Sequence, residues 1–465
     1  MSDQFRNRED GHNLIRWFEN QLKNNDAHFL DLNVYVDVIE DYLDEEKYKK
    51  ALKTCNLGIA QYPYSAELLF NKAQTLSHLE RYEEALTELD RAANLQPNDY
   101  DILMLRSNIL SWMGNYQGSV DELKRLVGLS EEKDEIYYQI GMAFQHMADY
   151  RQAAKYYKLA LQWNLHHEDA MYELAYCLDM TGELEDSLSY YQQFIDRDPY
   201  SVQAWYNLGI VYNKLERFDK AIQAYEYAIL IDDTFGSAHF NMGNTYMNLK
   251  QYKKAYDAYR KTHDVEGGNA ETYCCMGAAL EKLESYNRAM RMYSKATKLD
   301  EEYDEAWFGF GACLHQQERW MEATYALRKA LRLNDANYLY WYILAEAERK
   351  LGNIASSSEA FEEATLLNPL CLEIWQGWSY LYFENSNFEM AVSVTMSALE
   401  ELPDSPDLLY YATAYLISDG QYKDAFIYLE NALTLDFDKH EILYDFFPKL
   451  ETQKALFKII DQYRN

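Results

Sequence analysis

Large apolar and small side chains recur along this chain at a fixed interval of 34 residues. Within each interval the apolar positions lie three or four residues apart, which places them on one face of a helix. A second stripe of the same kind follows after a short polar stretch. The interval that begins at residue 202 shows both stripes, with Trp205, Leu208, Gly209 and Tyr212 in the first and Ala221, Tyr225 and Ala228 in the second. Each interval therefore predicts two amphipathic helices joined by a turn.

The register continues in both directions without an insertion, so the chain is a tandem repeat. Complete repeats begin at residues 32, 66, 100, 134, 168, 202, 236, 270, 304, 338, 372 and 406, and together they cover residues 32–439. One helix pair of this size cannot bury its apolar face alone, whereas stacked neighbours bury it continuously. We therefore expect one elongated array, rather than the two to four domains that a length of 465 residues would otherwise suggest.

Small residues mark where the two helices of each pair cross. Position 8 is Gly, Ala or Ser in ten of the twelve repeats, and position 20 is Ala or Ser in all of them. Two helices approach closely only where their side chains are small, so these positions predict the crossing point. Five of the seven prolines fall at position 32, where the second helix must stop: Pro63, Pro97, Pro199, Pro369 and Pro403.

The order Trp, Leu, Gly, Tyr, Ala, Tyr, Ala, Pro on a 34-residue period resembles the tetratricopeptide repeat (TPR) family. This resemblance implies an all-α, right-handed superhelical solenoid of helix-turn-helix repeats. It also implies a concave groove that binds a peptide or protein segment. Lys72, Arg106 and Glu348 depart from the pattern because they stand where other repeats carry an apolar residue. We expect their repeats to pack less regularly.

Residues 1–31 and 440–465 lie outside the repeats and are expected to cap the array, since each end would otherwise expose an apolar face. Near the start, Leu14, Ile15, Phe18 and Leu22 form a stripe on a helix at about residues 12–24. That helix is either a cap or a segment that docks in the groove or on a second subunit. After Pro448, an amphipathic closing helix is expected, with a partial repeat before it.

The resemblance implies that positions 2, 5, 6, 9, 12 and 13 of the first helix line the groove. Adjacent residues of a helix point about 100° apart, so positions 4 and 5 cannot both face the core. Position 5 is nevertheless aromatic in eight of the twelve repeats. These rings either form a binding surface or pack against neighbouring helices and stiffen the array.

Asparagines narrow the predicted site. Asn inside a helix is less favourable than Ala by about half a kcal/mol, but its amide offers donors and an acceptor that suit an extended peptide backbone. In some members of the family an asparagine ladder holds peptides in this way. The alternative is chance enrichment on a polar face. The best candidate site is Tyr172, Tyr206, Asn207, Asn213, Phe240, Asn241, Asn244 and Asn248, with a secondary set of Phe70, Asn71, Asn108, Tyr138, Phe308 and Tyr342.

Charge restricts the class of partner. The chain has 44 basic and 76 acidic side chains, a net charge of −32, which disfavours nucleic acid and anionic membranes as main partners. Position 2 is acidic in eight repeats. The helix dipole accounts for such residues without any partner, but they would also form an acidic rim that attracts a basic peptide. Positions 2, 5 and 6 carry no Lys or Arg, so the family's carboxylate clamp for chaperone C-termini is not expected.

No sequence signature of catalysis stands out. The phosphate-binding loop, the zinc-protease motif and the nucleophile elbow are all missing, and the six cysteines are scattered. His166, His167 and Glu168 sit at a helix junction and are not expected to bind metal. We therefore expect a non-enzymatic protein without a cofactor. The first twenty residues lack the apolar segment of a secretory signal, so a cytoplasmic location is expected.

The function that these observations favour is a protein-interaction scaffold or adaptor. Two alternatives stay open. One is a non-catalytic subunit that recruits substrates to an enzyme, such as a glycosyltransferase. The other is a scaffold that assembles with copies of itself.

Overall fold

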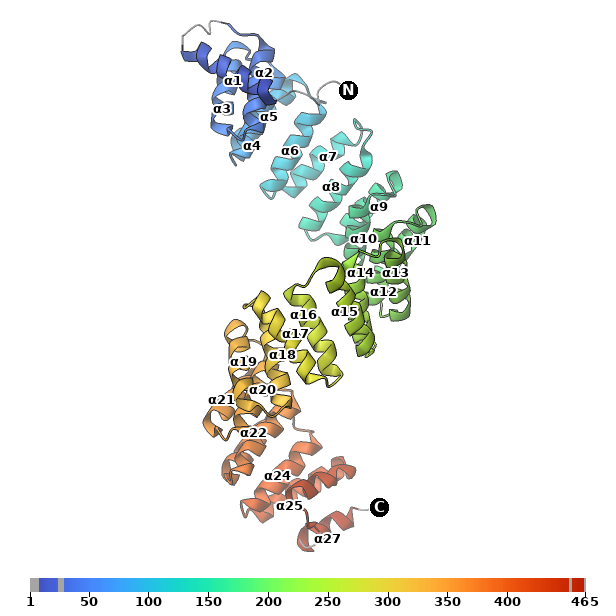
Figure 1. The fold of residues 1–465 in the computed structure, drawn as a ribbon, viewed down its shortest axis with the longest axis vertical. Coiled ribbons are helices and arrows are strands. Elements are labelled where there is room, and N and C mark those ends of the chain that lie inside the picture. The colour runs from blue at the N-terminus through green and yellow to red at the C-terminus, as the bar shows by residue number, and fades with distance from the viewer. Residues whose placement is uncertain (1–7, 24–28, 451–453, 464–465) are drawn as a thin grey trace. The chain divides into compact units, whose positions relative to one another are not determined.

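The computed structural model describes residues 8–23, 29–450 and 454–463. Its regular structure is helical throughout, and these residues contain no β-strand (Figure 1). The chain divides into two compact units, Met1–Ile231 and Asp232–Asn465, which are described separately below. The predicted all-α fold of paired helices is confirmed.

In both units, successive helices pack as antiparallel pairs, one pair per repeat. The first unit contains α1 (Arg8–Lys23), α2 (Leu32–Asp44), α3 (Tyr48–Gln61), α4 (Ala66–His78), α5 (Tyr82–Leu95), α6 (Tyr100–Trp112), α7 (Tyr116–Leu126), α8 (Lys133–His146), α9 (Tyr150–Trp163), α10 (Glu168–Met180), the 3-10 turn η1 (Leu184–Asp186), α11 (Ser187–Arg197), α12 (Val202–Lys214) and α13 (Phe218–Ile231).

The second unit contains α14 (Gly236–Asn248), α15 (Tyr252–Glu266), α16 (Ala270–Lys282), α17 (Tyr286–Leu299), α18 (Asp304–Gln316), α19 (Trp320–Leu333), α20 (Tyr338–Lys350), α21 (Ile354–Leu367), α22 (Leu372–Glu384), α23 (Phe388–Glu401), α24 (Pro406–Ser418), α25 (Tyr422–Leu435), the 3-10 turn η2 (Asp438–Glu441), α26 (Ile442–Phe446) and α27 (Lys454–Gln462). The even-numbered helices from α2 to α24 begin at the predicted repeat starts, except that α8 begins one residue early. The domain boundaries themselves stay a prediction.

Most pairs cross where a small residue at position 8 meets a larger one at position 24. A Cβ atom added to Gly209 would lie 2.4 Å from Cε1 of Tyr225, and one added to Gly243 would lie 2.6 Å from Cε1 of Tyr259. Both tyrosines are fully buried. The glycine is therefore a requirement of packing, because the ring fills the space that a methyl group would need.

The sizes of these two residues vary inversely in several repeats. Four repeats combine Gly with Tyr, another combines Ala73 with Leu89, and the repeat that begins at residue 32 combines Ile39 with Cys55. In these repeats side-chain volume is exchanged between the two helices, as close packing favours. In the repeat that begins at residue 168, Ala175 stands opposite Tyr191, and its second helix opens with the 3-10 turn η1.

The turn inside each repeat depends on a left-handed residue at position 15. Twelve residues occupy this position, and all have φ between +56° and +80°: Glu46, Glu80, Gly114, Ala148, Gly182, Glu216, Lys250, Glu284, Glu318, Gly352, Ser386 and Gly420. Glycine adopts this conformation without steric penalty, whereas the other residues are strained by it. The short turn therefore stores a small amount of strain in eight of the repeats.

The charged residues that depart from the repeat pattern are matched by opposite charges. Lys72 donates to Glu88 at 2.8 Å, and Arg106 lies 3.4 Å from Glu122, which occupies the same position of the next repeat. Both glutamates are buried. Glu348 accepts a hydrogen bond of 2.8 Å from Arg328. These repeats replace an apolar contact by an ion pair, and the repeat that contains Arg106 has a shorter second helix, α7, which ends at Leu126.

The terminal helices α1 and α27 each bury apolar side chains against neighbouring helices. In the first unit, Phe18 of α1 is buried and meets Tyr35 of α2 edge-on, with ring centroids 5.9 Å apart. In the second unit, Leu456 and Ile460 of α27 are buried in the cluster that includes Leu443 of α26. These contacts favour the cap interpretation of the N-terminal helix, because its apolar face is used within the unit.

Candidate functional site

Polar side chains link the first helices of neighbouring repeats along one face. In the first unit, Nε2 of Gln145 on α8 donates to Oε2 of Glu173 on α10 at 2.7 Å. Lys214 of α12 donates to Asp179 of α10. In the second unit, Arg349 of α20 donates to Glu384 of α22 at 2.8 Å. Since these residues occupy positions 6, 12 and 13, those positions share one surface, which we call the first-helix face.

On α10 this face carries three exposed apolar side chains. Tyr172, Tyr176 and Met180 are 52%, 39% and 51% exposed, respectively. They follow one another at intervals of four residues, which aligns them along the same side of the helix. We call this group the α10 ridge. On α8, Met142 is also exposed. Only Tyr172 was singled out from the sequence, although positions 9 and 13 of the repeat identify the other two as neighbours.

The other aromatic residues at position 5 are more deeply packed. Tyr138 and Tyr206 in the first unit lie against the buried Tyr157 and Tyr225, with ring centroids 5.7 Å and 6.1 Å apart. The second unit repeats the contact with Phe240 on Tyr259 at 5.5 Å, and with Tyr342 on Phe361 at 6.3 Å. Phe308 stacks on Tyr340 at 4.4 Å, and Phe70 packs against a core cluster. Most of these rings are therefore packed against other side chains, and Tyr172 is the exposed member of the predicted set.

Two of the four predicted asparagines of the first unit are buried. Asn207 is 3% exposed, and its Oδ1 accepts a hydrogen bond from Nε2 of Gln203 at 3.2 Å. Asn71 is 5% exposed, and its Nδ2 has no hydrogen-bond partner among the described residues. Asn108 and Asn213 are half-buried. In this free structure, Asn207 and Asn71 are covered by their neighbours.

In the second unit the three predicted asparagines lie on α14. Asn241 and Asn244 are half-buried, and Asn248 is exposed. Oδ1 of Asn244 accepts a hydrogen bond of 2.7 Å from the hydroxyl of Tyr259. Its Nδ2 donates to Oδ1 of Asn241 at 3.4 Å. The best candidate set is thus divided between the units, with Tyr172, Tyr206, Asn207 and Asn213 in the first and the other four in the second.

Carboxylates surround the ridge in the first unit. Burial raises the pKa of Tyr138, and the carboxylates of Asp169, Glu173 and Glu135 raise that pKa further. Asp169 is exposed in the first turn of α10. Carboxylates therefore lie near Tyr138 and along the first turns of α10.

The vicinal cysteines Cys274 and Cys275 and the junction residue His167 are held in the packing and hydrogen bonding of their helices. Burial raises the pKa values of Cys274 and Cys275 to about 12, so both are thiols at neutral pH. His167 begins α10 as its N-cap, where its Nδ1 accepts from the backbone of Ala170 at 3.2 Å. Within the described ranges, no group of three or more His, Cys, Asp or Glu residues could hold a metal ion. No helix in the described part of the chain is long and apolar enough to cross a membrane.

Comparison with known families agrees with the repeat pattern. Family profiles described as tetratricopeptide repeats match residues 42–109, 138–202, 202–235, 236–261, 276–338 and 338–369, which together exceed half of the chain. The protein is therefore a helical repeat protein. It belongs to the tetratricopeptide repeat family, whose stacked helix pairs present extended surfaces for binding.

Several solved structures are similar at low identity. YrrB, described as a TPR protein with an unusual peptide-binding site, is 21% identical, and the match covers 40% of this chain and 96% of YrrB with a TM-score of 0.36. The Cut9–Hcn1 hetero-tetramer of APC/C contains a chain that is 14% identical. The match covers 85% of this chain and 96% of that chain, with a TM-score of 0.40. Yeast Tom70 is 13% identical, and the match covers 84% of this chain and 96% of the Tom70 chain with a TM-score of 0.39. No curated protein sequence matches the chain.

Proposed function

We propose that this protein is a non-catalytic interaction scaffold whose first-helix face holds a basic segment of a partner protein at the α10 ridge. The exposure of Tyr172, Tyr176 and Met180 carries this proposal. Most other aromatic residues at position 5 contact a ring of their own hairpin, whereas the α10 ridge presents its side chains to solvent. An exposed apolar ridge with polar neighbours is typical of a protein-binding surface.

The chemistry of the ridge suits Lys or Arg side chains. A cation over a tyrosine face is stabilised by about 0.5–2 kcal/mol, depending on how far it is desolvated. Asp169 and Glu173 lie on the same helix and add long-range attraction. Met180 offers an adaptable apolar contact for the aliphatic stem of such a side chain. The ridge therefore selects for a segment that is both basic and amphipathic.

A reducing compartment is part of the proposal. The six cysteines are free, and four of them are buried. Buried free thiols are usual in cytoplasmic proteins, where disulfides seldom persist. We therefore place the scaffold in the cytoplasm.

The test compares binding of labelled basic, neutral and acidic peptides to the protein and to the double variant Tyr172→Ser/Tyr176→Ser, using fluorescence anisotropy. Interface tyrosines that act as hot spots contribute about 2 kcal/mol or more, so basic peptides should bind at least about tenfold more weakly to the variant. The control is Tyr64→Ser/Tyr200→Ser, which removes two tyrosines that are 84% and 79% exposed in turns between helices. Equal affinity of the ridge variant and the control for basic peptides would contradict the proposal.

A further inference from the structure

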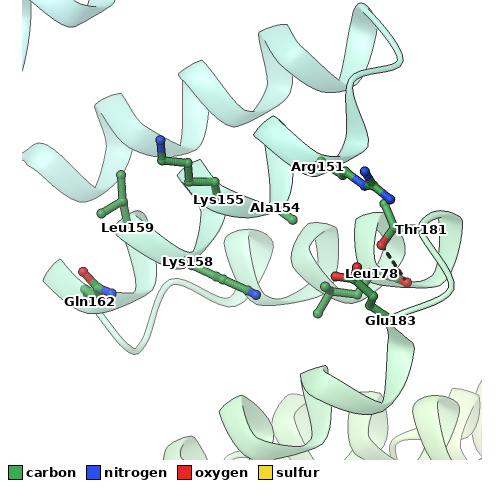
Figure 2. A pocket seen from close by; sticks show the side chains of 9 residues that line it. All are labelled: Arg151, Ala154, Lys155, Lys158, Leu159, Gln162, Leu178, Thr181 and Glu183. Carbon is green, nitrogen blue, oxygen red and sulfur yellow. Dashed lines mark hydrogen bonds between the residues drawn. The ribbon is translucent and has the colours of Figure 1, made fainter.

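A pocket of about 450 Å³ opens in the first unit between α9 and the C-terminal end of α10 (Figure 2). Its volume lies within the range of roughly 300–1,000 Å³ that is usual for ligand sites. The lining residues are Arg151, Ala154, Lys155, Lys158, Leu159, Gln162, Leu178, Thr181 and Glu183. The hydroxyl of Thr181 donates to the carbonyl of Leu178 at 3.2 Å, which ties the end of α10 at the pocket wall.

The α9 wall carries three cations on one stripe. Arg151, Lys155 and Lys158 are four and three residues apart, so they share a side of the helix. In the described part of the chain, no carboxylate lies within 4.0 Å of their charged groups. Lys155 and Lys158 only approach the rings of Tyr156 and Tyr190, at 5.9 Å and 5.7 Å from the centroids.

The grouping of these cations at one pocket is informative in so acidic a chain. Nearby basic residues such as Lys214 and Arg217 lie elsewhere and each pair with a carboxylate. Glu183 is the single acidic residue that lines the pocket, opposite three cations. The lining therefore has a net positive charge within a protein of charge −32. Such a pocket attracts an anionic ligand.

The inner wall adds an apolar surface. Leu178 and Ala154 are buried beneath the pocket, and Leu159 is half-buried beside them. A water molecule occupies about 30 Å³ of liquid, so the pocket has room for several side-chain groups rather than for a small ion alone. The ligand that fits this combination carries carboxylates on either side of an apolar side chain.

The spacing of the cations suits a peptide. A helix rises 1.5 Å per residue, so the stripe from Arg151 to Lys158 spans roughly 10 Å. Three residues of an extended peptide span roughly the same length. We propose that this pocket binds an acidic peptide segment of a partner protein, with an apolar side chain on Leu159 and Leu178 and flanking carboxylates on Arg151, Lys155 and Lys158.

This site is distinct from the α10 ridge. Leu178 precedes Met180 by two residues on α10, and side chains two residues apart on a helix point about 200° apart. Thr181 follows Met180 directly, so its side chain points about 100° away. The pocket therefore lies on another side of α10 and has the opposite charge preference. A scaffold with both sites holds a basic segment on one side and an acidic segment on the other.

The test uses a short fluorescent peptide in which Glu residues flank a central Leu. The charge-reversal variant Lys155→Glu/Lys158→Glu should bind it at least about tenfold more weakly, whereas Lys155→Arg/Lys158→Arg should bind it nearly as well as the unmodified protein. The control is Lys49→Glu/Lys53→Glu, which reverses two exposed lysines that lie one helical turn apart on α3. The ridge variant Tyr172→Ser/Tyr176→Ser should bind this peptide normally, so this result is independent of the proposed function.

Three outcomes would overturn the inference. Equal weakening by the α9 and α3 reversals would show a general charge effect. Equally tight binding of a peptide with Ser in place of Leu, or displacement by inorganic phosphate at matched ionic strength, would show a simple anion site. A dimer in sedimentation that Lys155→Glu/Lys158→Glu abolishes, without peptide binding, would identify a second copy of the chain as the occupant.

Discussion

The crossing of α12 and α13 offers a quantitative test of how the repeats pack. In Gly209→Ala, the new methyl carbon would lie 2.4 Å from Cε1 and 2.6 Å from Cδ1 of Tyr225. The optimum separation of two carbon atoms is about 3.5–4.0 Å. The atoms in conflict belong to the ring itself, and Tyr225 is 1% exposed, so the ring has no open space to turn into.

Two effects of opposite sign decide how much Gly209→Ala changes the free energy of unfolding. Alanine gains about 1 kcal/mol over glycine inside a helix through its higher propensity. Overpacking a filled core costs typically about 1–3 kcal/mol, and a conflict with a buried ring belongs at the upper end of this range. We therefore expect Gly209→Ala to lower the free energy of unfolding by about 1–2 kcal/mol.

The assay must resolve one hairpin, because a repeat array can unfold in segments. Amide hydrogen exchange across α12 and α13 measures the local stability, and thermal denaturation measures the whole. The control Gly128→Ala adds a methyl group at an exposed glycine whose nearest neighbour is the carbonyl oxygen of Arg125 at 3.9 Å, so it should be neutral or slightly stabilising.

A second substitution sharpens the test. Gly209→Ala/Tyr225→Leu reproduces the Ala73 and Leu89 combination that the chain already contains, and it should recover part of the stability lost by Gly209→Ala. If Gly209→Ala is as stable as the unmodified protein, helix propensity outweighs the contact, and the exchange of volume between positions 8 and 24 is not the packing rule.

Three further expectations concern other parts of the chain. Asn207→Ala should lower stability by about 1 kcal/mol with normal peptide capture, because Asn207 is buried and accepts from Gln203; exposed Asn248→Ala should weaken capture with an unchanged melting temperature, and normal capture by this variant would remove the asparagine ladder from the site. Glu216→Gly should stabilise by about 0.5–1 kcal/mol in thermal denaturation, since its φ of 57° strains every residue except glycine; a lower melting temperature would contradict the strain. Burial lowers the pKa of His315, so folding favours the neutral ring. The stability that this group contributes is present above its ordinary pKa of about 6.5 and is lost as the pH falls through the lowered value. His315→Gln should flatten the stability profile below pH of about 6.5 relative to the unmodified protein, and an unchanged profile would refute this role.

Much of the fold could be predicted because its signals are local and repeated. Helix starts, the small residues at positions 8 and 20, and the prolines after the second helix all act within one repeat of 34 residues. The glycine at position 8 and the tyrosine at position 24 were each visible in the sequence, but only the structure shows that Gly209 and Tyr225 are in contact. The left-handed residue at position 15 could not be recognised from the sequence, since glutamate occupies it in five repeats and glycine in four.

The candidate site was harder to predict because exposure depends on neighbours from other repeats. Tyr138 and Tyr172 occupy the same position, yet Tyr138 rests on Tyr157 while Tyr172 is exposed. Asn207 and Asn248 both belong to the predicted set, and the first is buried whereas the second faces solvent. Tyr138 and Tyr172 therefore show that one residue type at one position of the repeat can be packed in one repeat and exposed in another.

The sequence by itself determined the family, the phase of the repeats and the acidic character of the surface, because each follows from periodicity or from a count of residues. Tertiary structure alone decided which charges are paired and which rings are uncovered. Lys72 and Lys158 are both lysines on amphipathic helices, but Glu88 lies within hydrogen-bonding distance of the first, and no described carboxylate lies within 4.0 Å of the second. Electrostatic pairing depends on distances of a few ångströms between segments, and those distances exist only once the helices have packed.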